Sequence, residues 1–263
     1  MPVVTTPYAP GTPCWVDLMV PDQQAALDFY RDLFGWQGEV GPEEFGGYAV
    51  CTLLGKPVAG IMKAMSMDGS PLPPPTWTTY LSVRDATATQ EAVTANGGQV
   101  LAPAMAVGEL GRMLVALDPQ GAAFGAWEPL QFPGAQIVNE PGALVWSQLN
   151  TSDPAGAAAF YEAVAGLRAA PMPEMPEFTG FQVDGRTIGG LQGLENFEAG
   201  TPPHWLTNFA VDDVDSTVDA LVRARGTVLV PAFDMDKVGR MAVVQDPQGA
   251  AFAVVATSAP ALP

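Results

Sequence analysis

The sequence predicts an α+β protein of four modules, two in each half, and each module is a strand, a helix and several further strands. The first observation is a long repeat, because GRMLVALDPQGAAFGAWEP at 111–129 returns as GRMAVVQDPQGAAFAVVAT at 239–257. The second is a pair of amphipathic helices with matching capping residues, and the third is a pair of identical DPQG turns. The two copies therefore share a fold, and any difference in function lies in the residues that differ.

Three further blocks match in the same order. They are PCWVDLMVPDQQAALDFYRDLFGW (13–36) with LVWSQLNTSDPAGAAAFYEAVAGL (144–167), GKPVAGI (55–61) with GRTIGGL (185–191), and WTTYLSVRD (77–85) with WLTNFAVDD (205–213). The repeating unit is about half of the 263 residues, far longer than the repeat of a solenoid. Each copy is large enough to be a domain with its own core, and we expect these domains at 8–130 and 138–258.

Each repeat opens with a strand that leads into a helix. Residues 13–20 are strand-like, and the following apolar residues recur at i, i+3, i+4, i+7 and i+8, which predicts a helix with one buried stripe. Asp22 is the expected N-cap, and Gly35 is the expected residue just past the helix. In the second copy Asp153 caps the helix, Pro154 is its first residue and Gly166 ends it.

Short strands complete each module. In the first repeat we expect strands at 48–54, 58–63 and 77–83, a helix at about 85–96, and strands near 99–102, 112–118 and 122–128. The second repeat has equivalents of the first two at 182–184 and 187–191. DPQG places proline and glycine where a type I turn prefers them, which suits the link between the last two strands. The modules are therefore expected at 12–64, 77–128, 144–194 and 204–257.

Composition restricts the possible partners. Hydrophobic residues make up 48% of the chain and charged residues 15%, which is typical of well-filled cores rather than disorder. The net charge is −17, and acidic residues outnumber basic ones in both halves. Such a chain lacks the positive field that binding to a phosphate backbone or an anionic membrane needs. We therefore expect neither nucleic acid nor a membrane as a partner.

Targeting signals and a disulfide framework are not expected. The N-terminus has no basic segment followed by an apolar core, and nowhere is there an apolar run of membrane-spanning length, so the default is a soluble cytoplasmic protein. The two cysteines, Cys14 and Cys51, both lie in the first repeat and have no counterpart in the second. We expect them to be buried thiols that act as small apolar groups.

This module pattern resembles the vicinal oxygen chelate superfamily, which includes glyoxalases, extradiol dioxygenases and bleomycin-resistance proteins. The resemblance rests on VDLMVPDQQAALDFYRDLFGW, NTSDPAGAAAFYEAVAGL and the DPQG turns, and covers about 10–130 and 140–257. It implies two glyoxalase-like domains, each a cupped, mostly antiparallel sheet of two paired modules with the helices outside. The chain most closely resembles the two-domain, metal-lacking glyoxalase-like proteins of actinobacteria, often described as hydroxylases or as a 27 kDa antigen; some accompany aromatic polyketide pathways.

The resemblance also indicates where a metal would be held. Members that use a divalent metal place His, Gln or Glu on the first strand of each module and Glu on the last strand of the domain. The corresponding positions fall at Trp15 and Trp146 on the first strands, at about Thr78 and Leu206 on the second-module strands, and at Gly125 and Ala253 on the last strands. A divalent cation needs several nitrogen, oxygen or thiolate ligands that converge on one point. That set is missing, so we expect no metal and no other cofactor.

Two titratable residues are possible exceptions. Asp17 lies two residues beyond Trp15, so strand alternation puts it on the same face and inside the cup. Asp17 is either a catalytic or ligand-binding group or an ordinary structural carboxylate. His204, the only histidine, lies where a connector enters a strand. It is either a structural or rim residue or a group that transfers a proton or contacts substrate.

Rings and amides replace the missing ligands on the faces that line the cups. They are Trp15, Tyr80 and Trp127 in the first repeat and Trp146, Gln148, Asn150 and Asn208 in the second. The first cup is therefore expected to be aromatic and the second rich in amides. The rings either plug the cups or form an apolar slot for a flat molecule, which the amides and one carboxylate would orient.

Three functions follow from this pattern. The first is a metal-independent protein that holds a small hydrophobic or aromatic metabolite, such as a polyketide, as an accessory biosynthetic or resistance factor. The second is a cofactor-independent hydroxylase, isomerase or lyase in which Asp17 removes a proton. The third is a metal-dependent glyoxalase or dioxygenase. Two repeats can pair within one chain as two subunits do in single-domain relatives, so we expect a monomer, with a homodimer as the alternative.

Overall fold

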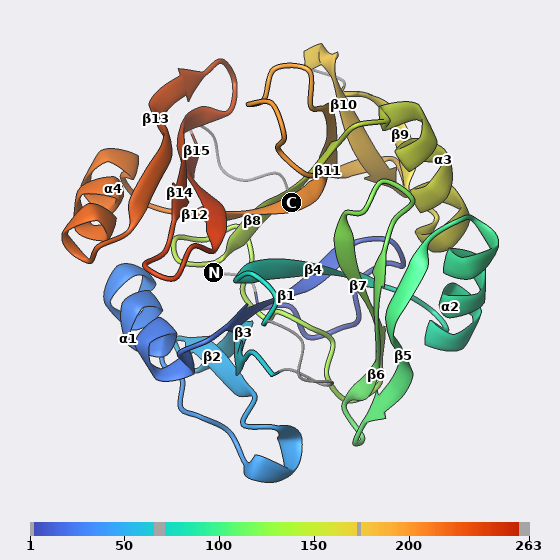
Figure 1. Cartoon of the computed structure of the whole chain (residues 1–263), viewed down its shortest axis with the longest axis horizontal. Helices are drawn as coiled ribbons and strands as arrows, with labels where there is room; N and C mark the ends of the chain where they lie inside the picture. The colour runs from blue at the N-terminus through green and yellow to red at the C-terminus, as the bar shows by residue number, and fades with distance from the viewer. Residues whose placement is uncertain (1–2, 66–71, 173–174, 258–263) are drawn as a thin grey trace.

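Two curled mixed sheets, each with two helices, form the structure, which is a computed structural model (Figure 1). It describes residues 3–65, 72–172 and 175–257. The first sheet contains β1 (Pro13–Val20), β2 (Ala49–Leu53), β3 (Lys56–Lys63), β4 (Thr76–Ser82), β5 (Gln99–Val107), β6 (Gly111–Leu117) and β7 (Ala123–Pro129). The second contains β8 (Leu144–Thr151), β9 (Arg168–Met172), β10 (Met175–Val183), β11 (Arg186–Gly193), β12 (His204–Ala210), β13 (Thr227–Met235), β14 (Gly239–Gln245) and β15 (Ala251–Thr257). The predicted fold class is confirmed.

The two sheets repeat one topology. Their strand orders are β2-β3-β1-β4-β7-β6-β5 and β13-β14-β15-β12-β8-β11-β10-β9. At the centre of each sheet the first strands of two modules pair antiparallel, β1 with β4 and β8 with β12. Each of these strands also pairs parallel with a later strand of its own module, and the remaining pairs are antiparallel. This arrangement brings the first strands of both modules to the middle of one curled sheet.

The helices begin and end where their capping residues predict. They are α1 (Gln23–Phe34), α2 (Ala86–Ala95), α3 (Pro154–Ala165) and α4 (Val214–Arg223), and a 3₁₀ turn spans Glu43–Phe45. The Asp22 carboxylate accepts a hydrogen bond from the Ala25 backbone N–H at 3.0 Å, and Gly35 takes the left-handed conformation with φ 76°. Asp153 and Gly166 do the same for α3. Among the described residues, no helix is long and apolar enough to cross a membrane.

Two features of the strands differ from the sequence prediction. β5 and β10 are longer than the strands expected at 99–102 and 182–184, and β9 was not expected at all. β9 contains Pro171 and has no clear apolar alternation, so periodicity alone does not reveal it. It forms because its backbone groups pair with β10, at the edge of the sheet.

The buried core does not follow the boundary between the repeats. One core joins Tyr30 and Trp77 of the first repeat to Phe209 and Phe252 of the second. The other core joins side chains of β4, β6, β7 and α2 to those of β8, α3, β10 and β12. The expectation that each repeat has its own core is therefore wrong. Each core is built mainly from one module of each repeat, with single side chains from the neighbouring modules, and accordingly α1 lies beside α4 and α2 beside α3 (Figure 1).

The DPQG turns connect the two repeats as well as neighbouring strands. The Asp246 carboxylate accepts hydrogen bonds from the backbone of its own turn and, at 3.1 Å, from the Tyr30 hydroxyl of the first repeat. Tyr30 in turn accepts a hydrogen bond from the Trp77 indole at 3.1 Å. Asp118, Tyr161 and Trp205 repeat this arrangement in the other core. We call the two sets of three residues the seam triads.

Both cysteines are buried and free, as expected. Cys51 lies in the core of the first module, and Cys14 lies beside Trp15. Burial raises the pKa of the Cys51 thiol to about 12, so the reactive thiolate is disfavoured at neutral pH. The two side chains therefore act as small apolar groups.

Candidate functional site

Strand alternation separates a core face from a concave face in each sheet. On β1, Val16, Leu18 and Val20 point into the core, so Trp15 and Asp17 lie on the opposite face. We call the concave face of the first sheet, which carries Trp15, Asp17, Tyr80 and Trp127, the first cup. The concave face of the second sheet, which carries Trp146, Gln148, Asn150 and Asn208, is the second cup. The predicted site residues of each repeat therefore share one face.

The strand register defines the positions at the centre of each cup. Trp15 pairs with Tyr80, and Tyr80 pairs with Gly125. In the second sheet Trp146 pairs with Asn208, which pairs with Ala253. The central positions of the second-module strands are thus Tyr80 and Asn208, two residues beyond the predicted Thr78 and Leu206. The register of an antiparallel pair is set by cross-strand contacts and bulges, which counting along one strand does not reveal.

These central residues do not fit a divalent cation. The first cup offers an indole, a phenol and a glycine, and the second offers an indole, a carboxamide and an alanine. Among the described residues, no three His, Cys, Asp or Glu side chains converge. A cation of this kind needs several oxygen, nitrogen or thiolate donors around one point. The central positions of the two cups thus supply rings, an amide and small side chains, and Asp17 adds one carboxyl group to the first cup.

Asp17 is the centre of a hydrogen-bond network in the first cup. Its carboxylate accepts a hydrogen bond from the Tyr48 hydroxyl at 3.3 Å, and that hydroxyl accepts one from the Trp15 indole N–H at 2.7 Å. Burial raises the pKa of Asp17 to about 7, although hydrogen bonds from Tyr80, Tyr48 and Thr78 oppose the rise. A carboxyl group with this pKa exchanges its proton near neutral pH, which is a property of general acids and bases.

Tyr48 is a residue of this network that strand alternation alone does not identify, although the sequence contains a signal for it. Tyr48 precedes β2, and its ring occupies the space that a side chain at Gly60 would fill. The Tyr80 ring lies over Gly125 in the same way, and Trp127 lies over Gly111. Glycines at cup-facing positions of the first sheet therefore mark where aromatic rings lie against neighbouring strands.

The segment between the repeats closes part of the first cup. Phe132 packs edge-on against Trp15, with ring centroids 5.0 Å apart, and against Trp127 at 6.0 Å. The Trp127 indole donates a hydrogen bond to the Phe132 carbonyl at 2.9 Å, and Tyr8 packs against the same cluster. The rings of this cup therefore pack on one another.

The second cup has a different chemistry. The Trp146 indole donates a hydrogen bond to the Gln148 side-chain oxygen at 3.1 Å, and both side chains are half-buried. The Asn208 amide donates to the Leu206 carbonyl at 3.0 Å. Asn150 is 1% exposed, and its side-chain nitrogen lies 3.1 Å from Nε2 of His204. The structure therefore brings one of the predicted amides of the second repeat, Asn150, together with His204.

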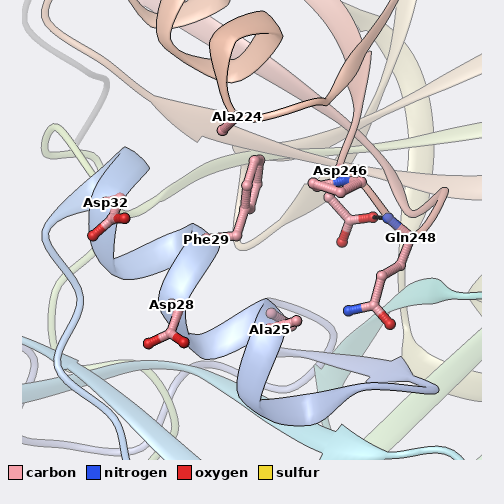
Figure 2. A pocket seen from close by; sticks show the side chains of 9 residues that line it. Ala25, Asp28, Phe29, Asp32, Ala224, Asp246 and Gln248 are labelled. Atoms are coloured by element: carbon pink, nitrogen blue, oxygen red, sulfur yellow. Dashed lines mark hydrogen bonds between the residues drawn. The ribbon is translucent and has the colours of Figure 1, made fainter.

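The two cavities found along α1 lie outside both cups. One, of about 310 Å³, lies between α1 and the DPQG turn of the second repeat, and Figure 2 shows Asp28, Phe29 and Gln248 in its wall. The Gln248 amide exchanges two hydrogen bonds with the Asp22 backbone, at 2.8 and 2.9 Å. The other cavity, of about 540 Å³, is lined mostly by polar residues of α1, of the segment 37–39 and of β2. The first cavity is part of the packing between repeats and does not present the rings and amides of the cups.

Comparisons with known proteins agree with this geometry. Residues 13–125 match the Glyoxalase/Bleomycin resistance protein/Dioxygenase superfamily, and residues 146–255 match a glyoxalase-like domain. The protein CFP32 of Mycobacterium tuberculosis is 43% identical over 254 residues, which cover 94% of this chain and 95% of that protein. The anthracycline biosynthesis protein DauV of Streptomyces sp. strain C5 is 36% identical over 269 residues, which cover 95% of this chain and 94% of DauV.

Solved structures share the fold at low sequence identity. The 2,3-dioxygenase LapB from Pseudomonas sp. KL28 superposes with a TM-score of 0.64 and 15% identity, over 99% of this chain and 96% of LapB. A Mn(II)-bound glyoxalase from Novosphingobium aromaticivorans superposes with a TM-score of 0.61 and 14% identity, over 96% of this chain and 86% of that one. At such identities the likeness concerns the fold alone, because one scaffold supports many chemistries.

Proposed function

Because the chain belongs to the Glyoxalase/Bleomycin resistance protein/Dioxygenase superfamily, we propose that it binds a flat, largely apolar aromatic metabolite in a cup without a metal ion. In this proposal the protein is an accessory factor in the biosynthesis of that metabolite or in resistance to it. The observation that carries the proposal is the set of central cup residues, which supplies rings, an amide and small side chains. Such a set recognises a guest by shape, stacking and a few hydrogen bonds.

The names of the relatives support the class of guest. DauV, which aligns with this chain over nearly its whole length, is named for anthracycline biosynthesis. We therefore propose a planar polyketide or a similar fused aromatic compound as the guest. The strongly acidic chain also suits a neutral or cationic guest better than an anionic one.

The available contacts are sufficient for useful affinity. One ring that covers a guest face contributes roughly 1.5–3 kcal/mol from buried area and about 0.5–1.5 kcal/mol more from stacking. Association itself costs several kcal/mol, so two or three such contacts are needed to reach about −8 kcal/mol, which corresponds to micromolar binding. Trp146 in the second cup is only half-buried, so part of its side chain is exposed to a guest.

Thermal unfolding with and without a guest tests the proposal. A fused aromatic quinone at about a hundred times its dissociation constant stabilises the folded state by about 2.7 kcal/mol, which raises Tm by roughly 5–10 °C in a chain of this size. A saturated polycyclic hydrocarbon of similar volume is the matched control and should produce a much smaller shift. If a panel of planar polyketides at high micromolar concentration leaves Tm unchanged, the binding function is wrong.

Proton transfer by Asp17 is a second candidate function, favoured by its pKa of about 7 in an aromatic surrounding. Here Asp17 takes a proton from a carbon acid held against Trp15, and Tyr48 stabilises the carboxylate by donating a hydrogen bond. Asp17→Asn should then abolish turnover of a bound polyketide while its Kd stays within about twofold of wild type. Unchanged turnover in this variant would exclude the role.

A further inference from the structure

Asn150 presents an unpaired hydrogen-bond acceptor. Its side-chain oxygen is buried and has no hydrogen-bond partner among the described residues. Buried acceptors in folded proteins nearly always meet a donor from protein, water or ligand, so an unpaired one indicates an absent partner. Because Asn150 alternates with the core residue Leu149 along β8, its side chain lies on the cup face.

His204 fixes the direction of this acceptor. Nδ1 of the ring lies 2.8 Å from the Pro202 carbonyl, which can only accept, so Nδ1 carries the proton. Nε2 lies 3.1 Å from the amide nitrogen of Asn150, which can only donate, so Nε2 accepts this hydrogen bond. The amide nitrogen of Asn150 is thereby engaged, which leaves its oxygen for a donor from elsewhere.

Most other unpaired buried groups cannot serve a guest. The hydroxyls of Thr79, Ser147 and Thr207 also lack partners among the described residues, but they alternate with cup residues and face the core between the sheets. Gln120 belongs to a DPQG turn outside the cups. Among the residues predicted to line the cups, Asn150 is thus the one with an unpaired buried acceptor.

The first cup has no such acceptor at the equivalent place. The register places Met19 where the second sheet has Asn150, and Met62 where it has Gln192. Two apolar thioether side chains thus correspond to two amides. The copies therefore differ at one defined end of the cup, where two amides of the second repeat correspond to two thioethers of the first.

We propose that the second cup is where the guest binds, and that Asn150 accepts a hydrogen bond from a hydroxyl group on the guest's aromatic ring. This inference rests on the proposed function. It adds which cup binds the guest, which residue contacts it, and that the guest is a planar phenol rather than its ether. The Trp146 ring provides the stacking surface on the same strand. A site built to pair with a hydroxyl rejects an analogue without it, because its buried acceptor is then left unpaired.

A two-by-two binding experiment tests the inference. The probes are a hydroxylated anthraquinone with a free phenol and its methyl ether, and the proteins are the wild type and Asn150→Met, which copies the first cup. Isothermal titration should show that the wild type prefers the phenol by about tenfold. Asn150→Met should bind both probes equally, with the affinity for the ether within about twofold of wild type. Met19→Leu, in the first cup, is the matched control and should keep the tenfold preference.

The outcomes separate this inference from the proposed function. If both probes bind the wild type but neither the methyl group nor Asn150→Met changes affinity, the inference is wrong, the acceptor serves only a buried water, and the binding function stands. Loss of the preference in Met19→Leu but not in Asn150→Met would place the contact in the first cup and also overturn the inference. If neither probe binds, both the binding function and the inference fail.

Discussion

The two cups share a scaffold but differ in what their polar groups do. In the first cup Asp17, Tyr48 and Trp15 bond to one another, and Phe132 from the segment between the repeats packs onto the rings. In the second cup the Asn150 oxygen stays without a partner among the described residues. The polar groups of the first cup are therefore largely hydrogen-bonded to one another, whereas the Asn150 oxygen of the second cup lacks a donor. The two halves of this repeat protein therefore need separate functional assignments.

The seam triads, in contrast, are alike in the two repeats. The seam triads Trp77–Tyr30–Asp246 and Trp205–Tyr161–Asp118 use the same residue types and the same bonds. Each triad contains residues of both repeats. A substitution in either repeat would therefore disturb a core that both repeats share. Within this chain the copies agree where they pack together and differ where they face a cup.

The largest expected effect lies in the seams. Tyr30→Ala and Tyr161→Ala each remove a fully buried ring that packs against several others, and each should lower the free energy of unfolding by about 3–5 kcal/mol. Chemical denaturation should show one cooperative transition in both variants, because each core contains both repeats. Two separate transitions, or a loss of stability in only one variant, would contradict the equivalence of the seams.

Asp17→Asn should have the next largest effect, and it should stabilise the protein. Burial raises the pKa of Asp17 from its ordinary value of 3.8 to about 7, so the folded state binds a proton more readily than the unfolded state between these values. The stability of the wild type therefore falls as pH rises through this window, and the asparagine variant should gain ~2–4 kcal/mol at pH ~8. Near pH ~4 the two proteins should be equally stable in urea titrations. A constant difference across pH would show that Asp17 does not titrate there.

Substitutions at the central small residues Gly125 and Ala253 should change stability to different extents in the two cups. Gly125→Ala places a methyl group against the Tyr80 ring and should destabilise the protein by about 1–3 kcal/mol. Ala253, its counterpart, already carries that methyl group, and Ala253→Gly should cost only about 1 kcal/mol. Calorimetric Tm values check the order of the two variants. Equal losses would mean that no ring needs the space over Gly125.

Tyr48→Phe should have the smallest effect. It removes the hydroxyl that donates to Asp17 and accepts from Trp15, at an expected cost of about 1 kcal/mol in stability. Because that hydrogen bond lowers the pKa of Asp17, its loss should move the carboxyl pKa further upward. A pH titration of the Asp17 carboxyl by NMR measures the direction. A downward shift of the Asp17 pKa would show that the Tyr48 hydroxyl is not the donor that lowers it.

Much of the fold could be predicted because it depends on local signals. Asp22 and Gly35 fix the ends of α1, and the two DPQG segments form the expected turns between adjacent strands. The shared cores could not be predicted, because the residues of a seam triad are far apart in the sequence and periodicity does not say which apolar stripes meet. The cup residues were placed on the correct face by alternation, but the cross-strand register that selects Tyr80 over Thr78 depends on pairing between strands.

The roles of the site residues were harder to predict than their positions. The sequence suggests Asp17 and His204 as titratable candidates, but not that Tyr48 would bond to one or Asn150 to the other. Both contacts depend on side-chain directions that follow from the curl of the sheet. Their roles in binding or catalysis stay predictions that the experiments above address.

The cores that span the repeats have a consequence for how the cups came to differ. A half-length chain with this fold would leave uncovered those parts of the convex side of its sheet that its own helices do not reach, so it would need a second copy to cover them. In such a symmetric pair every substitution is made twice, and the two concave faces must stay identical. Once both copies are joined in one polypeptide, that constraint is lifted. One concave face can then form hydrogen bonds within the protein and support the fold, while the other can change to bind a molecule.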